Sequence, residues 1–450
     1  MAVLQVLLWL LTACLCLGNF TEAADQLTEP LPRMTYRHFT VQESDGVVVG
    51  IVPVEESRTP RWAREVPQPA AMWPAPSGEP FFHVPIPFVI PPADAGEPFH
   101  AHNHQPAITW LSNGDLLAIW YSTGRETGTE LTVLASRLRA GQAKWDPASE
   151  FFKTPGHNMH GSSIFHDGSG GVFHINGMGP EGATGWSRLA LLLRTSRDNG
   201  VTWSTARPIS SGAAYQQRHQ VIAGTFLTSE GVLVQACDAT PEGEGPTALH
   251  LSRDGGQSWS DAGGDIRGIH AGVAELTGGR LIAFGLGQAL DGRMPVSVSA
   301  DLGKSWTSAP SPFPPIGGGQ RLVLKRLQEG PLLLISFTSG DRRDPEAQGM
   351  TFLREDGTEF TGHGMFAALS FDDGATWPLR KLLTPGTGDF DGGAWTGRFR
   401  ASPTRAEHAG YLAATQSPDG VIHLISSRLH YRFNLAWLQS AIPSEVRTKP

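Results

Sequence analysis

The 450-residue chain is poor in cysteine and in charge. It has three cysteines, of which Cys14 and Cys16 lie in an apolar N-terminal segment. Without that segment Cys237 has no partner, so an internal disulfide is excluded and the fold must be stabilised by burial of apolar groups. Charged residues make up 17% of the chain, the formal net charge is −8, and no run of Lys and Arg occurs. Because nucleic-acid phosphates require a basic surface, we expect no nucleic-acid partner.

Long apolar runs are also missing after residue 17, so the sequence predicts no transmembrane segment. Residues 3–17 are apolar and are followed by the small residues Ala23 and Ala24, a pattern typical of a secretory signal over residues 1–24. The run from Leu11 to Cys14 also resembles a bacterial lipoprotein box, which would anchor the protein through Cys14. We therefore expect a secreted or periplasmic protein, with lipoprotein anchoring as the alternative.

Long helical periodicity is absent, whereas Gly (53 residues) and Pro (34 residues) are abundant. This composition favours many short strands joined by tight turns, and therefore an all-β fold. One motif, Ser-x-Asp-x-Gly-x-Ser/Thr-Trp, occurs four times, and a degenerate fifth copy runs from Ser136 to Trp145. The Asp carboxylate can accept backbone N–H groups, Gly can adopt positive φ, and Trp can cover the turn, so each copy predicts a hairpin. The four copies begin at Ser196, Ser252, Ser299 and Ser370.

A second repeat consists of a polar opening, a strand, a turn and another strand. Its openings follow one another at intervals of 56, 59, 51, 51 and 87 residues. Four strands in such a period are typical of a propeller blade, so we predict a six-bladed β-propeller with four-stranded antiparallel blades over residues 81–440. Residues 81–90 would supply the outer strand of the last blade, after a Pro-rich leader over residues 25–80 and before a tail over residues 441–450. The six openings are His104, His160, His219, His270, Arg321 and His408.

The Ser-x-Asp-x-Gly-x-Ser/Thr-Trp motifs are Asp boxes, and residues 95–440 resemble the sialidase superfamily of BNR-repeat glycosidases. This resemblance implies a propeller that acts on a glycan at its central pocket. It also implies that the Asp boxes lie on the outer turns of the blades, where their role is structural. The function must therefore be sought at the inner strands.

The inner strands of a propeller line the central axis, and five of the six openings here begin with histidine. A ring of imidazoles around one axis has no packing rationale, so we expect a functional pocket. Arg218 and Arg321 are the candidate clamps for an anionic group, since guanidinium pairs with carboxylate or sulfate. The remaining openings, His104, His160 and His219, are candidate substrate-binding residues.

The resemblance further implies roles for individual residues. Tyr411 matches the position of the nucleophilic tyrosine of sialidases, and Glu126 matches the acid/base carboxylate. The sequence departs from the family at the first substrate-binding arginine, which is His104, and at the carboxylate that activates the tyrosine, which is near His270. The third arginine falls near His363. The base for Tyr411 would then be His270, His408 or Glu407.

Four functions are compatible with these residues. We expect first an exo-acting glycoside hydrolase on an acidic or otherwise decorated glycan. A polysaccharide lyase that uses His and Tyr on a uronate-containing glycan is the second interpretation. The third is a site in which three or more imidazoles hold Zn, Cu or Fe. The fourth is a non-catalytic, lectin-like propeller. We expect a monomer with no cofactor other than such a metal.

Overall fold

A computed structural model describes residues 39–44, 47–54, 59–68, 73–94, 96–209, 215–239 and 245–444. Over these residues the chain is all-β apart from helix α2 (Leu435–Gln439) and short 3₁₀ turns at Arg61–Ala63, Gln217–His219 and Thr277–Gly279. The expected signal segment and Cys14 lie outside the described residues. Within the described ranges, no helix has the length and apolar character needed to cross a bilayer.

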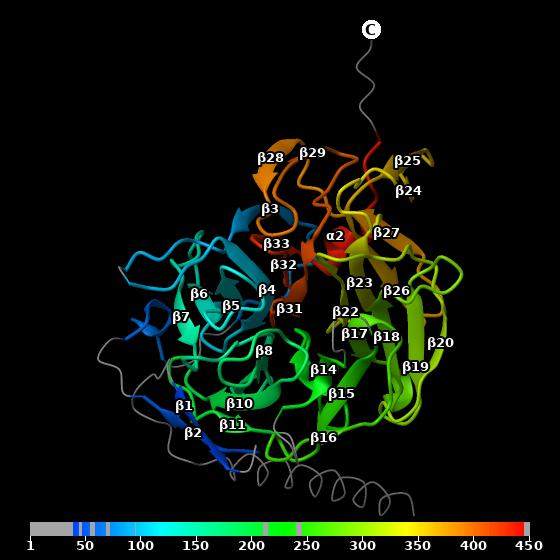
Figure 1. Cartoon of the computed structure of the whole chain (residues 1–450). Helices are drawn as coiled ribbons and strands as arrows, with labels where there is room; N and C mark the ends of the chain where they lie inside the picture. Colours follow the sequence, from blue (N-terminus) through cyan, green and yellow to red (C-terminus); the bar gives the residue numbers. More distant parts are fainter. Residues whose placement is uncertain are drawn as a thin grey trace, which may run out of the picture.

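Six antiparallel sheets of four or five strands make up most of the described structure, and Figure 1 shows them arranged around a common centre. The first sheet contains β4 (His102–Trp110), β5 (Leu116–Thr123), β6 (Thr132–Leu138) and β7 (Ser149–Phe152). The second contains β8 (Ser162–His166), β9 (Val172–Met178), β10 (Ala190–Ser196) and β11 (Arg207–Pro208). The third contains β12 (Gln220–Val221), β13 (Phe226–Leu227), β14 (Leu233–Asp238), β15 (Thr247–Ser252) and β16 (Ser260–Asp261).

The fourth to sixth sheets follow the same plan. The fourth contains β17 (Ile269–Glu275), β18 (Leu281–Leu286), β19 (Pro295–Ser299) and β20 (Thr307–Pro310). The fifth contains β22 (Val323–Arg326), β23 (Leu332–Phe337), β26 (Met365–Ser370) and β27 (Leu379–Leu382). The sixth contains β31 (Ala413–Gln416), β32 (Ile422–Ile425), β33 (Leu429–Phe433) and β3 (Phe82–Pro87). Strand β4 contacts both β8 of the second sheet and β31 of the sixth, so the first and last sheets are neighbours.

Four two-stranded sheets complete the described strands. The pair β1 (Phe39–Ser44) and β2 (Val47–Pro53) is antiparallel, whereas β21 (Gln320–Arg321) and β30 (Gly410–Tyr411) are parallel. The hairpins β24 (Met350–Leu353)–β25 (Glu359–Gly362) and β28 (Gly388–Asp391)–β29 (Arg398–Ala401) lie within the long interval that follows the fifth opening. Figure 1 shows both hairpins projecting from the same end of the molecule.

The sixth sheet joins the two ends of the described chain. Strand β3 pairs with β33, with Phe82 opposite Phe433 and Pro87 opposite Leu429. This pairing confirms the prediction that residues 81–90 supply the outer strand of the last sheet. Aromatic packing stabilises this pairing, because the Phe82 ring stacks on Phe433 at a centroid separation of 5.9 Å.

The Asp boxes form the turns between the third and fourth strands of four sheets. In the first copy Ser196 Oγ donates to Asp198 (2.8 Å), Gly200 N donates to Ser196 Oγ (3.0 Å), and Trp203 Nε1 donates to the Gly200 carbonyl (3.3 Å). The same three contacts recur in the other copies. Gly200 has a φ of +71°, and a Cβ there would lie 3.1 Å from Leu117 of the preceding sheet. The boxes thus both close hairpins and dock one sheet on the next.

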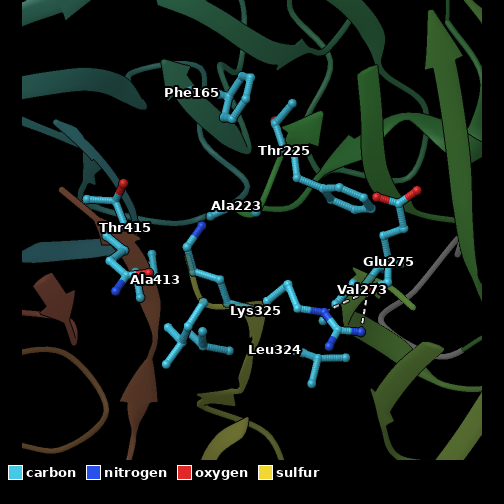
Figure 2. Close-up of a pocket in the computed structure, with 18 of the residues that line it drawn as sticks. Phe165, Ala223, Thr225, Val273, Glu275, Leu324, Lys325, Ala413 and Thr415 are labelled. Carbon is cyan, nitrogen blue, oxygen red and sulfur yellow. Dashed lines mark hydrogen bonds between the residues drawn. The ribbon is translucent and has the colours of Figure 1, made fainter. Parts of the chain in front are cut away.

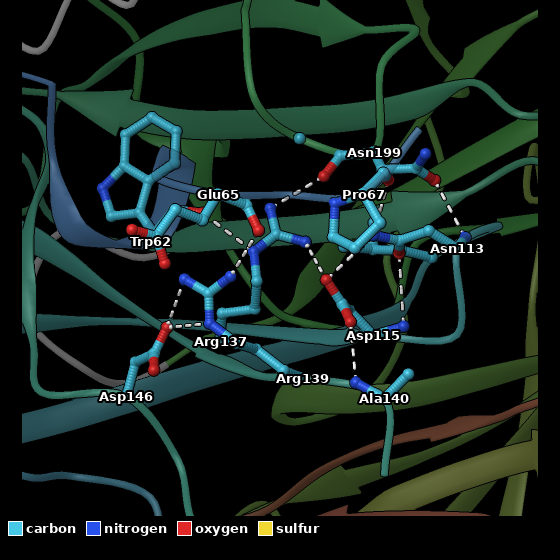
Figure 3. Close-up of polar contacts among 12 residues, drawn as sticks. Trp62, Glu65, Pro67, Asn113, Asp115, Arg137, Arg139, Ala140, Asp146 and Asn199 are labelled. Atoms are coloured by element: carbon cyan, nitrogen blue, oxygen red, sulfur yellow. Dashed lines mark hydrogen bonds and ion pairs between the residues drawn. The ribbon is translucent and has the colours of Figure 1, made fainter. Parts of the chain in front are cut away.

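Part of the expected leader packs on the first two sheets around Arg137. The Arg137 guanidinium forms an ion pair with Asp115 at 2.9 Å and donates to the carbonyls of Asn199 (2.7 Å) and Trp62 (2.8 Å), as Figure 3 shows. Both charged side chains are buried, at 0% and 2% exposure. Because a buried ion pair holds only if its remaining hydrogen bonds are satisfied, these carbonyls fix the N-terminal segment to the sheets.

Candidate active site

The inner strands bring several of the predicted residues to one place. The parallel pairing of β21 with β30 sets Arg321 opposite Tyr411, and the guanidinium carbon lies 4.4 Å from the centre of the tyrosine ring. The ring of His104, on β4, lies 3.9 Å from the same tyrosine ring. Side chains from the first and fifth openings therefore lie against Tyr411.

Tyr411 is hydrogen-bonded to a buried histidine–carboxylate pair. His270 Nε2 lies 2.9 Å from the Tyr411 hydroxyl, and His270 Nδ1 contacts the carboxylate of Asp238. Asp238 Oδ1 also accepts the His270 backbone N–H at 2.6 Å. With Asp238 on Nδ1, the imidazole is oriented with Nε2 toward the phenol. This is the hydroxyl–imidazole–carboxylate arrangement that activates a weak oxygen nucleophile.

The backbone at His270 is held in an unusual conformation. His270 has a φ of +54°, in the left-handed region that non-glycine residues rarely adopt, and the pairing of β17 with β18 shifts register between Ile269 and Gly272. Such a conformation costs roughly 1–3 kcal/mol. The bulge turns the His270 ring toward Tyr411, and the Asp238 hydrogen bonds to its ring and its N–H hold it there.

The pKa values of this group follow from burial and neighbouring charge. Burial raises the pKa of the Tyr411 phenol well above its ordinary value, so attack by its oxygen requires a base. Burial alone would also raise the pKa of Asp238, but the charge and hydrogen bonds of His270 and the charge of Arg321 lower it below its ordinary value. Asp238 is therefore a carboxylate, as an orienting partner for imidazole must be.

Glu126 forms a second polar group beside the first. Its carboxylate accepts from the Tyr121 hydroxyl at 2.8 Å and lies 2.9 Å from His102 Nε2. Burial acts to raise the pKa of Glu126, but the hydrogen bonds from His102 and Tyr121 and the nearby His160 bring it below its ordinary value. The Glu126 side chain is 27% exposed, so a ligand can reach it.

Two histidines beside these groups, His104 and His160, are neutral near pH 7. Burial, reinforced by neighbouring imidazoles and Arg321, lowers the pKa of His104 well below its ordinary value. Burial likewise lowers the pKa of His160 to about 4. His104 accepts a hydrogen bond from Trp395 Nε1 at 2.9 Å, and the His160 ring stacks on Trp186. His104 and His160 thus supply uncharged hydrogen-bonding groups.

Arg321 is the cation in the middle of this group. It is 1% exposed, and its Nε and Nη1 atoms have no hydrogen-bond partner among the described residues. Leaving a buried guanidinium nitrogen unsatisfied is costly, and a ligand that accepts from these atoms would remove the cost. Arg321 is therefore placed to bind an electron-rich group of a substrate.

Other predicted residues have different surroundings. Arg218 is bound by the carboxylates of Asp261 and Asp265, and His219 Nδ1 lies 2.8 Å from the Leu189 carbonyl. Their side chains already have polar partners in the second and third sheets. The structure therefore does not bring Arg218 to the anion clamp that was predicted around Arg321.

The three predicted residues near the end of the long fifth interval have contacts with other residues. Glu407 is fully buried and accepts from the Tyr431 hydroxyl at 2.7 Å and from Thr396 at 3.2 Å. The His408 ring packs edge-on against Phe399, and His363 lies after β25. Among the candidates for the base, the structure brings His270 to Tyr411.

Metal binding was an alternative for the histidines. Within the ranges that the structure describes, no three His, Cys, Asp or Glu side chains lie close enough together to hold a metal ion. The absence of a cofactor stays a prediction.

Asp238, Tyr121, Trp186 and Trp395 were not identified from the sequence. Asp238 ends β14, which pairs with the inner strand β12 of the third sheet, whereas the repeat pattern points to the inner strands. Its one signal is that a carboxylate ends a strand with no other charged residue. Trp395 lies on the connection between β28 and β29, which the repeat pattern does not cover.

Comparisons with known proteins agree with this geometry. Residues 114–424 match the family described as BNR repeat-like domain. A sialidase from Micromonospora viridifaciens is 24% identical over 378 residues, which cover 74% of this chain and 51% of that protein, so the chain spans about half of this relative's length.

Solved structures show the same fold. The intramolecular trans-sialidase from Ruminococcus gnavus has a TM-score of 0.52 and 13% identity, covering 77% of this chain and 97% of that one. The NanB sialidase from Streptococcus pneumoniae has a TM-score of 0.52 and 12% identity, covering 79% and 70%. The chain therefore belongs to the BNR repeat-like domain family, within the sialidase superfamily.

Proposed function

We propose that the chain is a closed six-bladed propeller that acts as an exo-glycoside hydrolase on an acidic or otherwise decorated glycan. Three observations support the closed ring: six sheets in chain order, contact between β31 and β4, and the pairing of β3 with β33. Membership of a family that includes sialidases supports glycoside hydrolysis. The observation that carries the proposal is the hydrogen-bonded series Tyr411–His270–Asp238.

Tyr411 is the proposed nucleophile. His270 Nε2 takes the phenol proton as the Tyr411 oxygen bonds to the anomeric carbon, and Asp238 stabilises the imidazolium that results. A tyrosine nucleophile is an established variant among retaining glycosidases. His270 here occupies the role for which the family uses a carboxylate. With an imidazole rather than a carboxylate against Tyr411, Arg321 keeps two guanidinium nitrogens without a partner among the described residues, and these can bind an anionic substrate group.

Glu126 is the proposed acid/base residue, together with His102. In the proposed step a proton of this pair, whose nearest atoms lie 2.9 Å apart, passes to the glycosidic oxygen as its bond to the anomeric carbon breaks. The Glu126 carboxylate then removes a proton from the water that attacks the glycosyl–tyrosine bond. Tyr411 leaves and recovers its proton from His270, so the protein returns to its starting state.

A polysaccharide lyase is the second candidate, because Arg321 lies beside both Tyr411 and His270. In that reaction Arg321 neutralises a uronate carboxylate, His270 removes the proton on the adjacent carbon, and Tyr411 protonates the leaving oxygen. The same three side chains thus fit either reaction. The two reactions differ in their products, since elimination leaves a C=C bond and hydrolysis does not.

A digest of acidic glycans separates these functions. Sialylated, sulfated and uronate-containing glycans are incubated with the protein, and both new reducing ends and the ultraviolet absorbance of unsaturated uronates are recorded. Released monosaccharide without absorbance supports the hydrolase, and absorbance supports the lyase. Tyr411→Phe should lower kcat by about 10³-fold or more in either case. Tyr215→Phe, whose hydroxyl bonds to Glu43 away from the site, is the control.

We also propose that the protein works outside the cytoplasm as a monomer without a cofactor, with a glycan as its substrate. The N-terminal apolar segment and the family support this location. A measurement of mass in solution, with metal analysis of active protein, tests these statements. A dimer, or loss of activity when metal is removed, would contradict them.

A further inference from the structure

A cavity of about 750 Å³ lies at the far end of the inner strands from Tyr411. Its lining includes Ile108, Lys325 and Thr415, which follow His104, Arg321 and Tyr411 by four residues each. Four residues of β-strand span about 13 Å. The cavity is therefore separate from the candidate active site, although the same strands build both.

The wall of this cavity combines apolar and polar side chains. Figure 2 shows Lys325 extending from β22 among apolar and threonine side chains. The volume falls in the range of sites that hold small organic molecules, about 300–1,000 Å³. The apolar lining includes Ala107, Ile108, Ile164, Ala223, Val273 and Leu324.

Lys325 is a charged residue of the cavity wall that lacks a countercharge among the described residues. No hydrogen bond or ion pair involves its ammonium group among the described residues, whereas each other ionisable lining residue has a partner. His166 bonds to Ser112 and to the Gly168 N–H, and Glu275 accepts from both the hydroxyl and N–H of Ser229. Arg326 donates to the carbonyls of Glu275 and Gly330 and pairs with Asp373. Burial lowers the pKa of Lys325, as expected of an ammonium without an anion.

We propose that this cavity is a second binding site, for a monocarboxylate with an apolar body that ion-pairs with Lys325. A single ammonium matches a single negative charge, and the apolar side chains of the lining can contact a hydrocarbon chain or ring. Burial takes the Lys325 ammonium group out of water, and an ion pair with the carboxylate compensates for the lost hydration. Because the cavity is remote from Tyr411, this site is independent of the proposed hydrolysis.

Calorimetric titration with hexanoate tests the site, with hexanol and inorganic phosphate as comparison ligands. Hexanoate should bind to the wild-type chain, and hexanol and phosphate should bind at least about tenfold more weakly. Equal binding of phosphate would overturn the apolar part of the proposal. No binding of hexanoate at millimolar concentration would overturn the site itself.

Two variants locate the binding. Lys325→Met should weaken hexanoate binding by about tenfold or more, whereas Lys304→Met, at an exposed position of the third Asp box, should leave it unchanged. Hexanoate should also protect Lys325 from reductive methylation, which peptide mass mapping of the wild-type protein detects without any variant. Binding that leaves Lys325 fully open to methylation would contradict the proposal even if Lys325→Met fails to fold.

Discussion

His270 Nε2 lies 2.9 Å from the hydroxyl of Tyr411, and the pair joins side chains that are 141 residues apart in sequence. The contact matters because burial raises the pKa of the phenol, which makes Tyr411 a weak nucleophile unless a base is in contact with it. We propose His270 as that base, with its orientation set by Asp238.

Replacement of Asp238 by Asn should therefore impair the reaction without removing the fold. The Asn amide can donate to His270 Nδ1, which leaves the proton on Nε2 and makes that atom unable to accept from Tyr411. We expect kcat to fall by about 10²–10⁴-fold with little change in KM. Steady-state kinetics and melting temperatures measure both effects. Asp265→Asn, at an exposed partner of Arg218, is the control, and equal activities of the two variants would contradict the role of Asp238.

Replacement of Glu126 by Gln should slow the reaction most for substrates whose leaving group must be protonated. A substrate with a natural sugar leaving group needs a proton and should lose about 10²–10⁴-fold in rate, whereas an aryl glycoside with a weakly basic phenol should lose far less in its first step. Burst kinetics on the two substrates measure this difference. The exposed Glu181→Gln is the control. Equal losses on both substrates would assign Glu126 a role other than proton transfer.

Glu407 should make the stability of the fold depend on pH. Burial raises its pKa from 4.5 to about 7, so between these values the folded state binds more protons than the unfolded state. The contribution of Glu407 to the free energy of unfolding is therefore fully present below about pH 4.5. It falls as the pH rises toward 7, by a total of about 3 kcal/mol. Glu407→Gln should remove this decline and be more stable than wild type near pH 8. Urea unfolding at several pH values measures it, and parallel pH profiles for the two proteins would refute it.

Arg137 should be required for stability. Arg137→Met leaves the buried Asp115 carboxylate without a countercharge, and it removes the hydrogen bonds to the carbonyls of Trp62 and Asn199. The free energy of unfolding should fall by about 3–5 kcal/mol. Arg400→Met removes an exposed pair with Asp389 and should change stability by less than about 1 kcal/mol. Denaturant midpoints compare the two. A small effect of Arg137→Met would mean that water enters and solvates Asp115.

The repeats predicted the sheets well because their signals are local. Ser196, Asp198 and Gly200 interact within one turn, so their spacing alone predicts that turn. The outer strand of the sixth sheet was also predicted, since a period of four strands leaves one strand missing at the end of the chain. The β24–β25 and β28–β29 hairpins follow no repeat and were not predicted.

The site was predicted only in part, because its contacts join distant segments. His270 was identified by its place in the repeat and Tyr411 by the resemblance to sialidases, but the sequence left three possible bases. Glu407 is four residues from Tyr411 in sequence, yet its carboxylate bonds to Tyr431 in the sixth sheet. Asp238 is marked in the sequence only by a carboxylate at the end of a strand. Its function arises from the bulge at His270, which no spacing rule predicts.

The pairing of β3 with β33 has a consequence for synthesis. Phe82 leaves the ribosome some 350 residues before its partner Phe433, so β3 spends most of translation without its sheet. Contacts between such distant segments form slowly, because a long chain must be closed to make them. The last sheet can therefore be completed only after β33 has been synthesised. Until it occurs, β3 offers unpaired backbone groups to other chains, and chaperones would be needed most in that interval.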